Sequence, residues 1–273
     1  MPEPKASLII SVYTNTVFLK AVLDALKYQT CKDFEILISE DGESPEMKKF
    51  LNAYPFEQPW QHLTQSDIGW RKNQALNRAI LASRSNYLVF IDGDCILHAR
   101  FMEMHLQYAN EKMILGGKRV KLNEKLTQQL LQKTLTINEM NSFLFRHFFQ
   151  LRKMGFRFHE EGLFIRPNGL FGFIPRLRKM SQLKGCNMSF HKKSILDING
   201  FDEDYIRPAI GEDIDLTWRF QRAGYKLRSV RNIAVQYHLN HKENWSDQED
   251  NIRIMEHKQL QNLFFCKNGI QKV

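Results

Sequence analysis

Hydrophobic residues in the first hundred positions of the chain follow two alternating patterns. Short apolar runs rich in β-branched and aromatic residues occur at Leu8–Val12, Phe34–Ile38 and Tyr87–Ile91. Between these runs, apolar residues recur at helical spacing, first over residues 18–26 and again over 76–80. Strands that alternate with helices predict an α/β fold with a mainly parallel sheet, whose ligands gather at the carboxyl ends of the strands.

Two of these apolar runs stop at acidic turns. Residues Ser39–Ser44 follow the second run, and Asp92, Gly93 and Asp94 follow the third. Carboxylates held at a sheet edge suit Mg²⁺ or Mn²⁺ bridging a diphosphate, because hard cations prefer oxygen ligands and the phosphates supply the others. Aspartate and glycine are also common turn residues, so the tripeptide alone favours a plain turn.

A second pair of neighbouring carboxylates, Glu212 and Asp213, begins a helix predicted at Glu212–Ala223, which Gly224 ends as a C-cap. Acidic residues in a first turn are favoured by the helix dipole. A carboxylate in this place can also take a proton from a hydroxyl group as a general base. The local pattern leaves both interpretations open.

Residues 123–184 interrupt the regular alternation. This stretch begins as a Gln-, Leu- and Lys-rich helical segment and continues as a segment rich in Phe and Arg. We predict an insertion over the active face of a single domain spanning residues 1–245, followed by a helical tail at 246–273. After the insertion, short strands are predicted at Lys226–Val230 and Ile233–Tyr237.

Composition places the chain among ordinary globular proteins. With 273 residues, 43% of them hydrophobic and 25% charged, it can form one large α/β domain. It has no run of about 20 apolar residues, and its start lacks the basic and apolar regions of a signal peptide. The four cysteines form no CxxC pair, which argues against a zinc site or disulfide framework. We therefore expect a cytoplasmic protein.

The formal net charge of +9 is concentrated in one region. Residues 146–184 hold nine Lys and Arg against two Glu, a net charge of +7. Three interpretations fit: a solvated basic face over a Phe-filled satellite core, attachment to an anionic membrane surface, or binding of an anionic glycan. No nucleic-acid-binding motif is recognised, so a nucleic acid is not an expected partner.

Taken together, the motifs resemble those of family-two glycosyltransferases. Six of them stand in that family's order: Leu8–Tyr13, Ser39–Glu43, Asp92 to Asp94, Lys184–Phe190, Asn199–Asp202 and Gly211–Asp213. The later motifs are similar to the C-terminal half of bacterial chondroitin-polymerase domains and of β-1,4-galactosyltransferases. The resemblance covers roughly residues 6–245. It implies a GT-A fold, in which flanking helices cover a Rossmann-like, mostly parallel sheet.

The resemblance also implies an activity. The implied enzyme is a hexosyl- or N-acetylhexosaminyltransferase that uses Mn²⁺ or Mg²⁺. It transfers a sugar from a nucleotide-sugar donor, expected to be a UDP-sugar, and inverts the configuration of the anomeric carbon. The implied acceptor is a glycan or a lipid-linked saccharide of bacterial surface polysaccharide or lipopolysaccharide synthesis. A lipid-linked acceptor would bring the enzyme to the inner face of the membrane, in peripheral contact with anionic lipid.

Several roles at the nucleotide follow from the same resemblance. Ser11 and Tyr13 are expected to cradle the base, and either Glu40 or Asp41 to bind the base or ribose.

The sequence departs from many relatives in the helix before Asp92. Those relatives carry an Arg-Asn pair where this chain has Leu76 and Asn77. The cations fall earlier here, so Arg71 or Lys72 is expected to contact the phosphates or the base.

The metal ligands implied by the resemblance are Asp92, Asp94 and a histidine. Asp92 and Asp94 are similar to the family's DXD pair, with Asp94 as the more direct ligand. His238 is similar to the third ligand of the galactosyltransferase-like branch, and His241 is a close alternative.

The remaining roles concern the sugar and the acceptor. Cys186, Asn187 and Met188 are similar to the segment that lines the donor-sugar pocket. Asp213 is the expected general base, and Glu212 is expected to bind acceptor hydroxyls.

Two other functions share part of this pattern. A sugar-phosphate nucleotidyltransferase also combines a Rossmann-like half with a divalent metal, but usually has a Gly-rich basic loop after the first strand. The loop Tyr13–Thr16 contains no glycine. A non-catalytic sugar-binding module would not need both carboxylate pairs.

Overall fold

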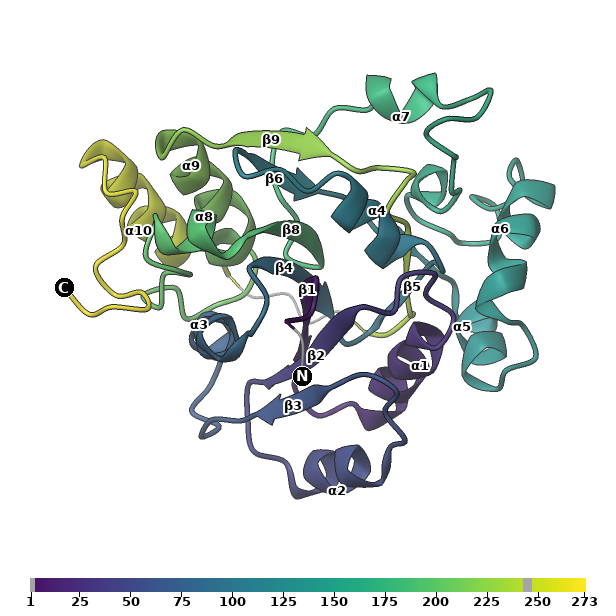
Figure 1. The fold of residues 1–273 in the computed structure, drawn as a ribbon, viewed down its shortest axis with the longest axis horizontal. Coiled ribbons are helices and arrows are strands. Elements are labelled where there is room, and N and C mark those ends of the chain that lie inside the picture. The colour runs from purple at the N-terminus through teal and green to yellow at the C-terminus, as the bar shows by residue number, and fades with distance from the viewer. Residues whose placement is uncertain (1–2, 243–246) are drawn as a thin grey trace.

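A seven-stranded sheet forms the centre of the computed structural model, which describes residues 3–242 and 247–273 (Figure 1). Neighbouring strands are parallel from β3 to β4, β8 runs antiparallel to both β4 and β6, and β9 is parallel to β6. In sheet order the strands are β3 (Trp60–Leu63), β2 (Phe34–Glu40), β1 (Ala6–Val12), β4 (Tyr87–Asp92), β8 (Asn187–His191), β6 (Met113–Gly116) and β9 (Lys226–Ser229). The predicted α/β fold with a mostly parallel sheet is confirmed.

A small second sheet joins distant parts of the chain. Its middle strand, β10 (Gln236–His238), is antiparallel to β5 (Cys95–Leu97) and parallel to β7 (Val120–Lys121). The strand predicted at Ile233–Tyr237 is wrong in its first half. There the amides of Ile233 and Ala234 donate to the carbonyl of Val230, which makes a turn.

Helices cover both faces of the large sheet (Figure 1). Asn15 caps the first helix, because its side chain accepts a hydrogen bond from the amide of Phe18. The predicted helix at Glu212–Ala223 begins with a π-helical turn, Ile210–Ile214, and Gly224 ends it with φ +90°. The α-helices are α1 (Thr16–Leu26), α2 (Pro45–Ala53), α3 (Lys72–Ala82), α4 (Phe101–Gln107), α5 (Glu124–Leu131), α6 (Ile137–Arg146), α7 (Phe173–Leu177), α8 (Lys192–Leu196), α9 (Asp215–Arg222) and α10 (Glu249–Leu260).

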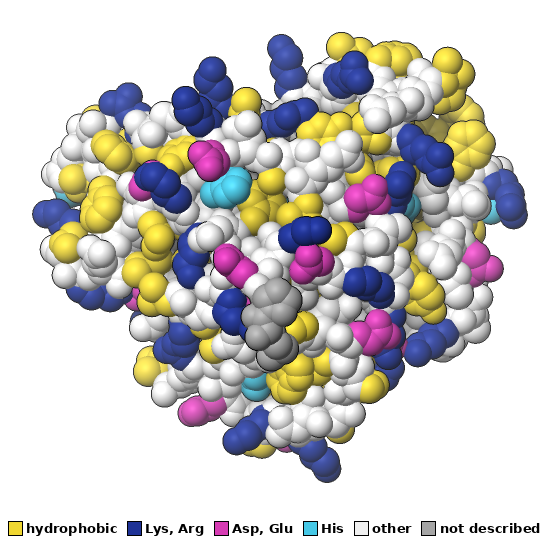
Figure 2. Space-filling model, in the orientation of Figure 1, with side chains coloured by type: hydrophobic (Ala, Val, Ile, Leu, Met, Phe, Trp, Pro, Cys, Tyr) yellow, Lys and Arg dark blue, Asp and Glu magenta, His cyan; other side chains and the backbone are white. Residues whose placement is uncertain are grey.

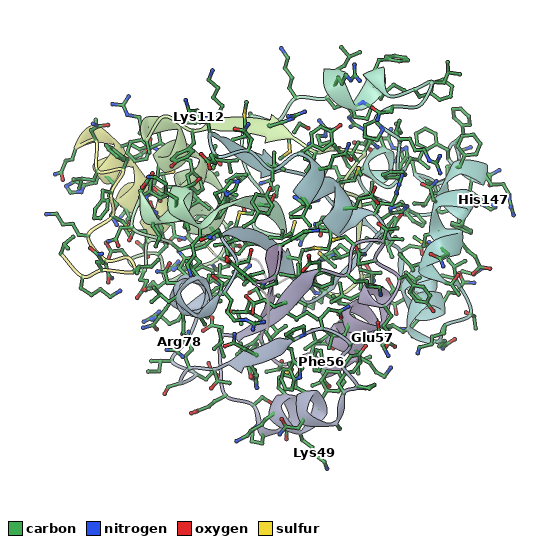
Figure 3. All side chains as sticks on the ribbon, in the orientation of Figure 1. Lys49, Phe56, Glu57, Arg78, Lys112 and His147 are labelled. Atoms are coloured by element: carbon green, nitrogen blue, oxygen red, sulfur yellow. The ribbon has the colours of Figure 1, made fainter. Side chains whose placement is uncertain are left out.

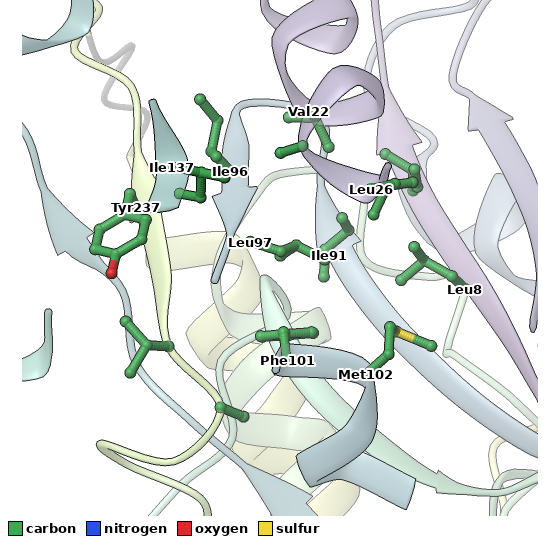
Figure 4. Packing of buried hydrophobic residues seen from close by; sticks show 14 of the residues in the cluster. Leu8, Val22, Leu26, Ile91, Ile96, Leu97, Phe101, Met102, Ile137 and Tyr237 are labelled. Atoms are coloured by element: carbon green, nitrogen blue, oxygen red, sulfur yellow. The ribbon is translucent and has the colours of Figure 1, made fainter. Parts of the chain in front are cut away.

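Two buried apolar clusters lie on the two faces of the sheet. Leu8 of β1 belongs to one cluster and its neighbour Ile9 to the other, as expected for a strand covered on both sides. Figure 4 shows Ile137 of α6 near Ile96 and Tyr237 in the first cluster. The segment predicted as an insertion is therefore packed onto the same core as β1 and β4.

The C-terminal tail contains the expected helix, α10, and then returns to the main body. The amide of Cys266 donates to the carbonyl of Ile198, and that of Ile270 to Asn199. The boundary predicted between residues 245 and 246 lies outside the described residues. No helix in residues 3–242 or 247–273 combines the length and apolar character needed to cross a bilayer.

Candidate active site

A cleft of about 610 Å³ opens where β1 and β4 end, and we call it the β1 cleft. This volume suits a small-molecule ligand of nucleotide size. The predicted residues that line it are Ser11, Tyr13, Asp41, Lys72, Asp92, Asp94 and His241, and they are joined by Phe18, Asp67 and Trp70.

Close backbone packing shapes the floor of the β1 cleft. The amide of Gly93 donates to the carbonyl of Ser11 at 2.8 Å. A Cβ atom on Gly93 would lie 2.6 Å from Cγ1 of Val12, so only glycine fits this turn without a shift. On the wall, the Tyr13 hydroxyl donates to Asp67 at 2.8 Å, and this bond raises the pKa of Tyr13. Tyr13 and Trp70 thus present aromatic rings to the cleft.

Of the two carboxylates in the turn after β2, Asp41 lines the β1 cleft and Glu40 does not. Glu40 is buried, where it accepts a hydrogen bond from the amide of Ser44 and lies 2.6 Å from Nε2 of His62. Asp41 accepts hydrogen bonds from the Gln65 side chain and from the backbone of residue 71. The expectation that Glu40 could bind the base is therefore corrected: its carboxylate holds the turn together.

The two predicted cations behave differently. Arg71 contributes its backbone amide to the turn, and its guanidinium donates to the carbonyl of Trp70. Lys72 lies in the cleft, with Nζ 2.9 Å from Oδ1 of Asp92 and 2.6 Å from Oε2 of Glu212. Burial opposes its charge, yet these two carboxylates hold the pKa of Lys72 well above its ordinary value.

Asp94 meets two histidines at one end of the β1 cleft. Its Oδ2 atom lies 3.3 Å from Nε2 of His238 and 2.9 Å from Nε2 of His241. Burial alone would raise the pKa of Asp94, but hydrogen bonds from both imidazoles hold it well below its ordinary value. Pairing of β10 with β5 sets this geometry, since His238 is in register with Cys95. The structure thus brings both histidine alternatives to the same carboxylate.

This trio offers one oxygen and two nitrogen ligand atoms within 4.8 Å of one another. Imidazole together with carboxylate suits Mn²⁺ better than Mg²⁺, which prefers an all-oxygen shell. The donor set therefore fits a divalent transition metal.

Both carboxylate oxygens of Asp92 form ion pairs with cations. Besides Lys72, the guanidinium of Arg119 lies 2.9 Å from its Oδ2. Its contacts thus place Asp92 in an ion-pair chain that runs from Arg119 to Glu212. Asp92 also lies with Asp94 and Cys95 in a second group of candidate metal ligands, so its expected role as a ligand stays a prediction. Arg119 was not predicted from the sequence, because β6, the strand that it follows, is only four residues long.

A second cleft of about 320 Å³ shares Asp92 with the first, and we call it the Glu212 cleft. Glu212 and Asp213 line it together with Arg119 and with Phe158 of the insertion. The turn of π-helix at Ile210–Ile214 places both carboxylates on this cleft.

The two carboxylates have different partners. Oδ1 of Asp213 accepts a hydrogen bond from the amide of Gly185 at 2.5 Å, and Oδ2 lies 3.0 Å from Nζ of Lys184. Glu212 is paired with Lys72, and burial raises its pKa. Asp213 is therefore held by Lys184 and Gly185, which line the same cleft.

Only one residue of the predicted donor-sugar segment reaches a described cleft. Cys186 lines the Glu212 cleft. Asn187 is buried, where its amide donates to the carbonyls of Lys118 and Ala234. Met188 is buried in the sheet. The expectation for Asn187 and Met188 is corrected, since neither lines the β1 cleft or the Glu212 cleft.

Two protein-family models match successive parts of the chain. Residues 7–172 match the family described as glycosyl transferase family 2, and residues 176–242 match the N-terminal domain of galactosyltransferase. The second block contains the Glu212 and Asp213 pair and both histidines.

Curated relatives are distant in sequence. Glycosyltransferase EpsH of Bacillus subtilis is 26% identical over 113 residues, which cover 41% of this chain and 32% of EpsH. The amylovoran biosynthesis glycosyltransferase AmsB of Erwinia amylovora is 23% identical over 241 residues, 88% of this chain and 71% of AmsB. The chain thus spans about a third of EpsH and most of AmsB.

Solved structures share the fold. The mannosyltransferase PcManGT from Pyrobaculum calidifontis, in complex with GDP-Man and Mn²⁺, matches with a TM-score of 0.55 and 13% identity over 95% of this chain and 62% of its own. S. aureus TarS 1-349, in complex with UDP-GlcNAc, matches with a TM-score of 0.57 and 13% identity over 94% of this chain and 66% of its own. The GT-A fold is confirmed. Since the first family match alone spans more than half of the chain, this protein belongs to glycosyl transferase family 2.

Proposed function

We propose that the protein transfers a hexosyl or N-acetylhexosaminyl group, with inversion, from a UDP-sugar to a glycan or lipid-linked saccharide. The observation that carries this proposal is the position of Asp92 between two clefts. One cleft has the size of a nucleotide and ends at a cluster of candidate metal ligands, and the other holds two carboxylates. A donor and an acceptor could therefore meet at Asp92.

On the donor side, Tyr13 and Trp70 would contact the base and Asp41 the ribose, since all three line the β1 cleft. Asp94, His238 and His241 would hold Mn²⁺, which stabilises the negative charge that develops on a departing diphosphate. Two structural neighbours, one bound to GDP-Man and Mn²⁺ and the other to UDP-GlcNAc, support a nucleotide-sugar donor.

On the acceptor side, Asp213 is the proposed general base. The Gly185 amide fixes one of its oxygens, while its other partner, Lys184, is partly exposed and can turn aside for an acceptor hydroxyl. Removal of the hydroxyl proton by a positioned base is worth about 10²–10⁴ in rate. Attack from the Glu212 cleft, opposite the leaving diphosphate, inverts the anomeric centre. Glu212, paired with Lys72, would bind an acceptor hydroxyl.

The proposed setting is surface polysaccharide or lipopolysaccharide synthesis at the cytoplasmic face of an anionic membrane. The name of AmsB, an amylovoran biosynthesis glycosyltransferase, supports a role in polysaccharide synthesis. The net charge of +7 over residues 146–184 supports an anionic surface as partner.

The direct test is incubation with a panel of nucleotide sugars and Mn²⁺, followed by measurement of released nucleotide and of sugar transferred to an acceptor. Nucleotide release from one donor above that of an Asp94→Asn variant is the expected result. Equal release by both proteins, or no release from any donor, would contradict the proposal.

A further inference from the structure

Four large apolar side chains are exposed on α7 and the turn before it. Leu170 is 86% exposed, Phe171 59%, Phe173 56% and Leu177 73%. Phe173 and Leu177 stand four residues apart, on one side of α7, whereas Pro175 between them is buried. Figure 2 shows hydrophobic side chains gathered at the corner of the molecule where α7 lies. An exposed apolar cluster of this kind marks an interaction surface.

Cations surround a cleft directly beside this cluster. The cleft, about 620 Å³, lies between the α7 segment and the edge strand β9, and we call it the β9 cleft. Five cations and, among the described residues, no carboxylate line it. The cations are Arg176, Arg178 and Lys179 from the α7 segment and Lys226 and Arg228 from β9. Figure 2 shows Lys and Arg side chains along this edge of the molecule.

Two of these cations are held in place by the fold. Nη1 of Arg178 donates to Oδ1 of Asn232 at 2.6 Å, and Nη2 lies 3.0 Å from Oε1 of Glu161. The guanidinium of Arg228 lies 4.3 Å from the ring centre of Tyr108. Arg178 and Arg228 are therefore fixed in the wall of the β9 cleft, and Glu161 balances the charge of Arg178.

We propose that α7 and the β9 cleft form a docking face for an anionic lipid bilayer. Apolar side chains beside cations suit the boundary between acyl chains and headgroups, where the first enter the bilayer and the second bind lipid phosphates. An anionic glycan in solution would satisfy the cations but leave the four apolar side chains in water. Charge complementarity and apolar exposure together thus favour the bilayer.

This face lies on the segment that also serves the proposed active site. Phe158, from the same insertion, lines the Glu212 cleft. The biological role of this docking face rests on the proposed function, since docking there would bring a lipid-linked acceptor to Asp213. Its physical basis, the exposed cluster and the cations, is independent of catalysis.

Sedimentation of the full chain with vesicles tests the docking face. With phosphatidylglycerol in phosphatidylcholine vesicles we expect strong binding that weakens as salt rises, because charges are screened over about 10 Å at 0.1 M ionic strength. Replacing both Leu170 and Leu177 with Ser should weaken partitioning on the order of tenfold, through lost apolar insertion. The matched control is Leu260→Ser on α10, at 88% exposure, which should bind like the wild type.

A second pair of variants tests the charges. Arg176→Gln with Lys179→Gln should lower binding to the anionic vesicles about fivefold per charge removed. Lys48→Gln with Lys49→Gln on α2 removes the same charge at the opposite end of the molecule and should have little effect (Figure 3). Equal binding to pure phosphatidylcholine vesicles, or wild-type binding by the Leu170 and Leu177 variant, would overturn the proposal.

Transfer to a water-soluble acceptor separates this inference from the proposed function. The four surface variants should keep wild-type transfer to such an acceptor. Vesicle binding without any transfer by the wild type would contradict the proposed function and leave the docking face standing. Transfer without vesicle binding would contradict the docking face and leave the proposed function standing.

Discussion

Asp94 is the residue on which the candidate metal site depends, because one imidazole from β10 and another from the residues that follow it converge on its carboxylate. Loss of either His238 or His241 should lower Mn²⁺ affinity by on the order of 100-fold, since each removes one of three protein ligands. Electron paramagnetic resonance of free Mn²⁺ measures this directly. His257→Ala on α10 is the control, with unchanged affinity expected. Wild-type affinity in both His238→Ala and His241→Ala would remove the site from this position.

Asp213 and Glu212 are neighbours with different surroundings, so their variants should separate chemistry from binding. Asp213→Asn keeps an acceptor for the Gly185 amide but loses the basic oxygen. Turnover should fall about 10²-fold or more while donor affinity persists. Glu212→Gln should instead raise the KM for the acceptor and unpair Lys72. Single-turnover kinetics with a saturating donor distinguish the two. Donor affinity lost in Asp213→Asn with turnover retained would assign Asp213 to binding.

Among the elements, the turn between β4 and β5 contains a glycine that close packing requires. A Cβ atom on Gly93 would lie 2.6 Å from Val12 and 3.2 Å from the carbonyl oxygen of Ser11. Gly93→Ala should therefore lower the free energy of unfolding by about 1–3 kcal/mol, as overpacking does. Gly42→Ala is the matched control, since its nearest neighbour would lie at 3.7 Å. Urea unfolding of both variants gives the comparison, and equal stabilities would contradict the close packing of β1 on this turn.

The contact between α4 and β8 predicts an acid sensitivity. His105 is buried, with Nδ1 2.7 Å from the Ser189 hydroxyl and Nε2 3.1 Å from Oδ1 of Asn187. Burial lowers its pKa from 6.5 to about 4, so the folded state favours the neutral ring more than the unfolded state does. The stabilisation is complete above pH 6.5 and is lost as the pH falls toward 4, up to roughly 3 kcal/mol.

Urea unfolding across that pH range measures the effect. His105→Gln should be less stable at pH 7 but should show a shallower loss between pH 6.5 and 4, because the group that titrates is gone. An exposed histidine variant, His257→Gln, should keep the wild-type slope. Parallel slopes for His105→Gln and wild type would assign the acid sensitivity to other groups.

At the scale of the whole molecule, the sequence predicts the half of the fold built from long apolar runs. Strands β1, β2 and β4 are found from their patterns, together with the carboxylates at their ends. The three strands of the small sheet are only two or three residues long, too short for a periodic pattern. Only their pairing shows that His238 and His241 both reach Asp94.

The sequence locates the clefts better than it locates the side chains that face them. Asp94, Lys72 and Asp213, which the sequence analysis names, line the two clefts. For Glu40 and Met188 the resemblance supplied a place in the sequence but not the direction of the side chain. Each strand residue alternates between two faces, so a shift by one position exchanges a cleft wall for the core.

The ligands at Asp94 have a consequence for how the chain folds. Asp94 and His241 are separated by 147 positions, so this contact closes one of the longest loops in the protein. Closing such a loop costs conformational entropy, and contacts between residues near in sequence do not offset that cost. An ion that binds only the closed state would add RT ln(1 + [L]/Kd) to stability, about 2.7 kcal/mol at a hundredfold excess over Kd. Mn²⁺ should thus raise the Tm of the wild type and not that of His241→Ala. The bound ion would then hold the two halves of the chain together.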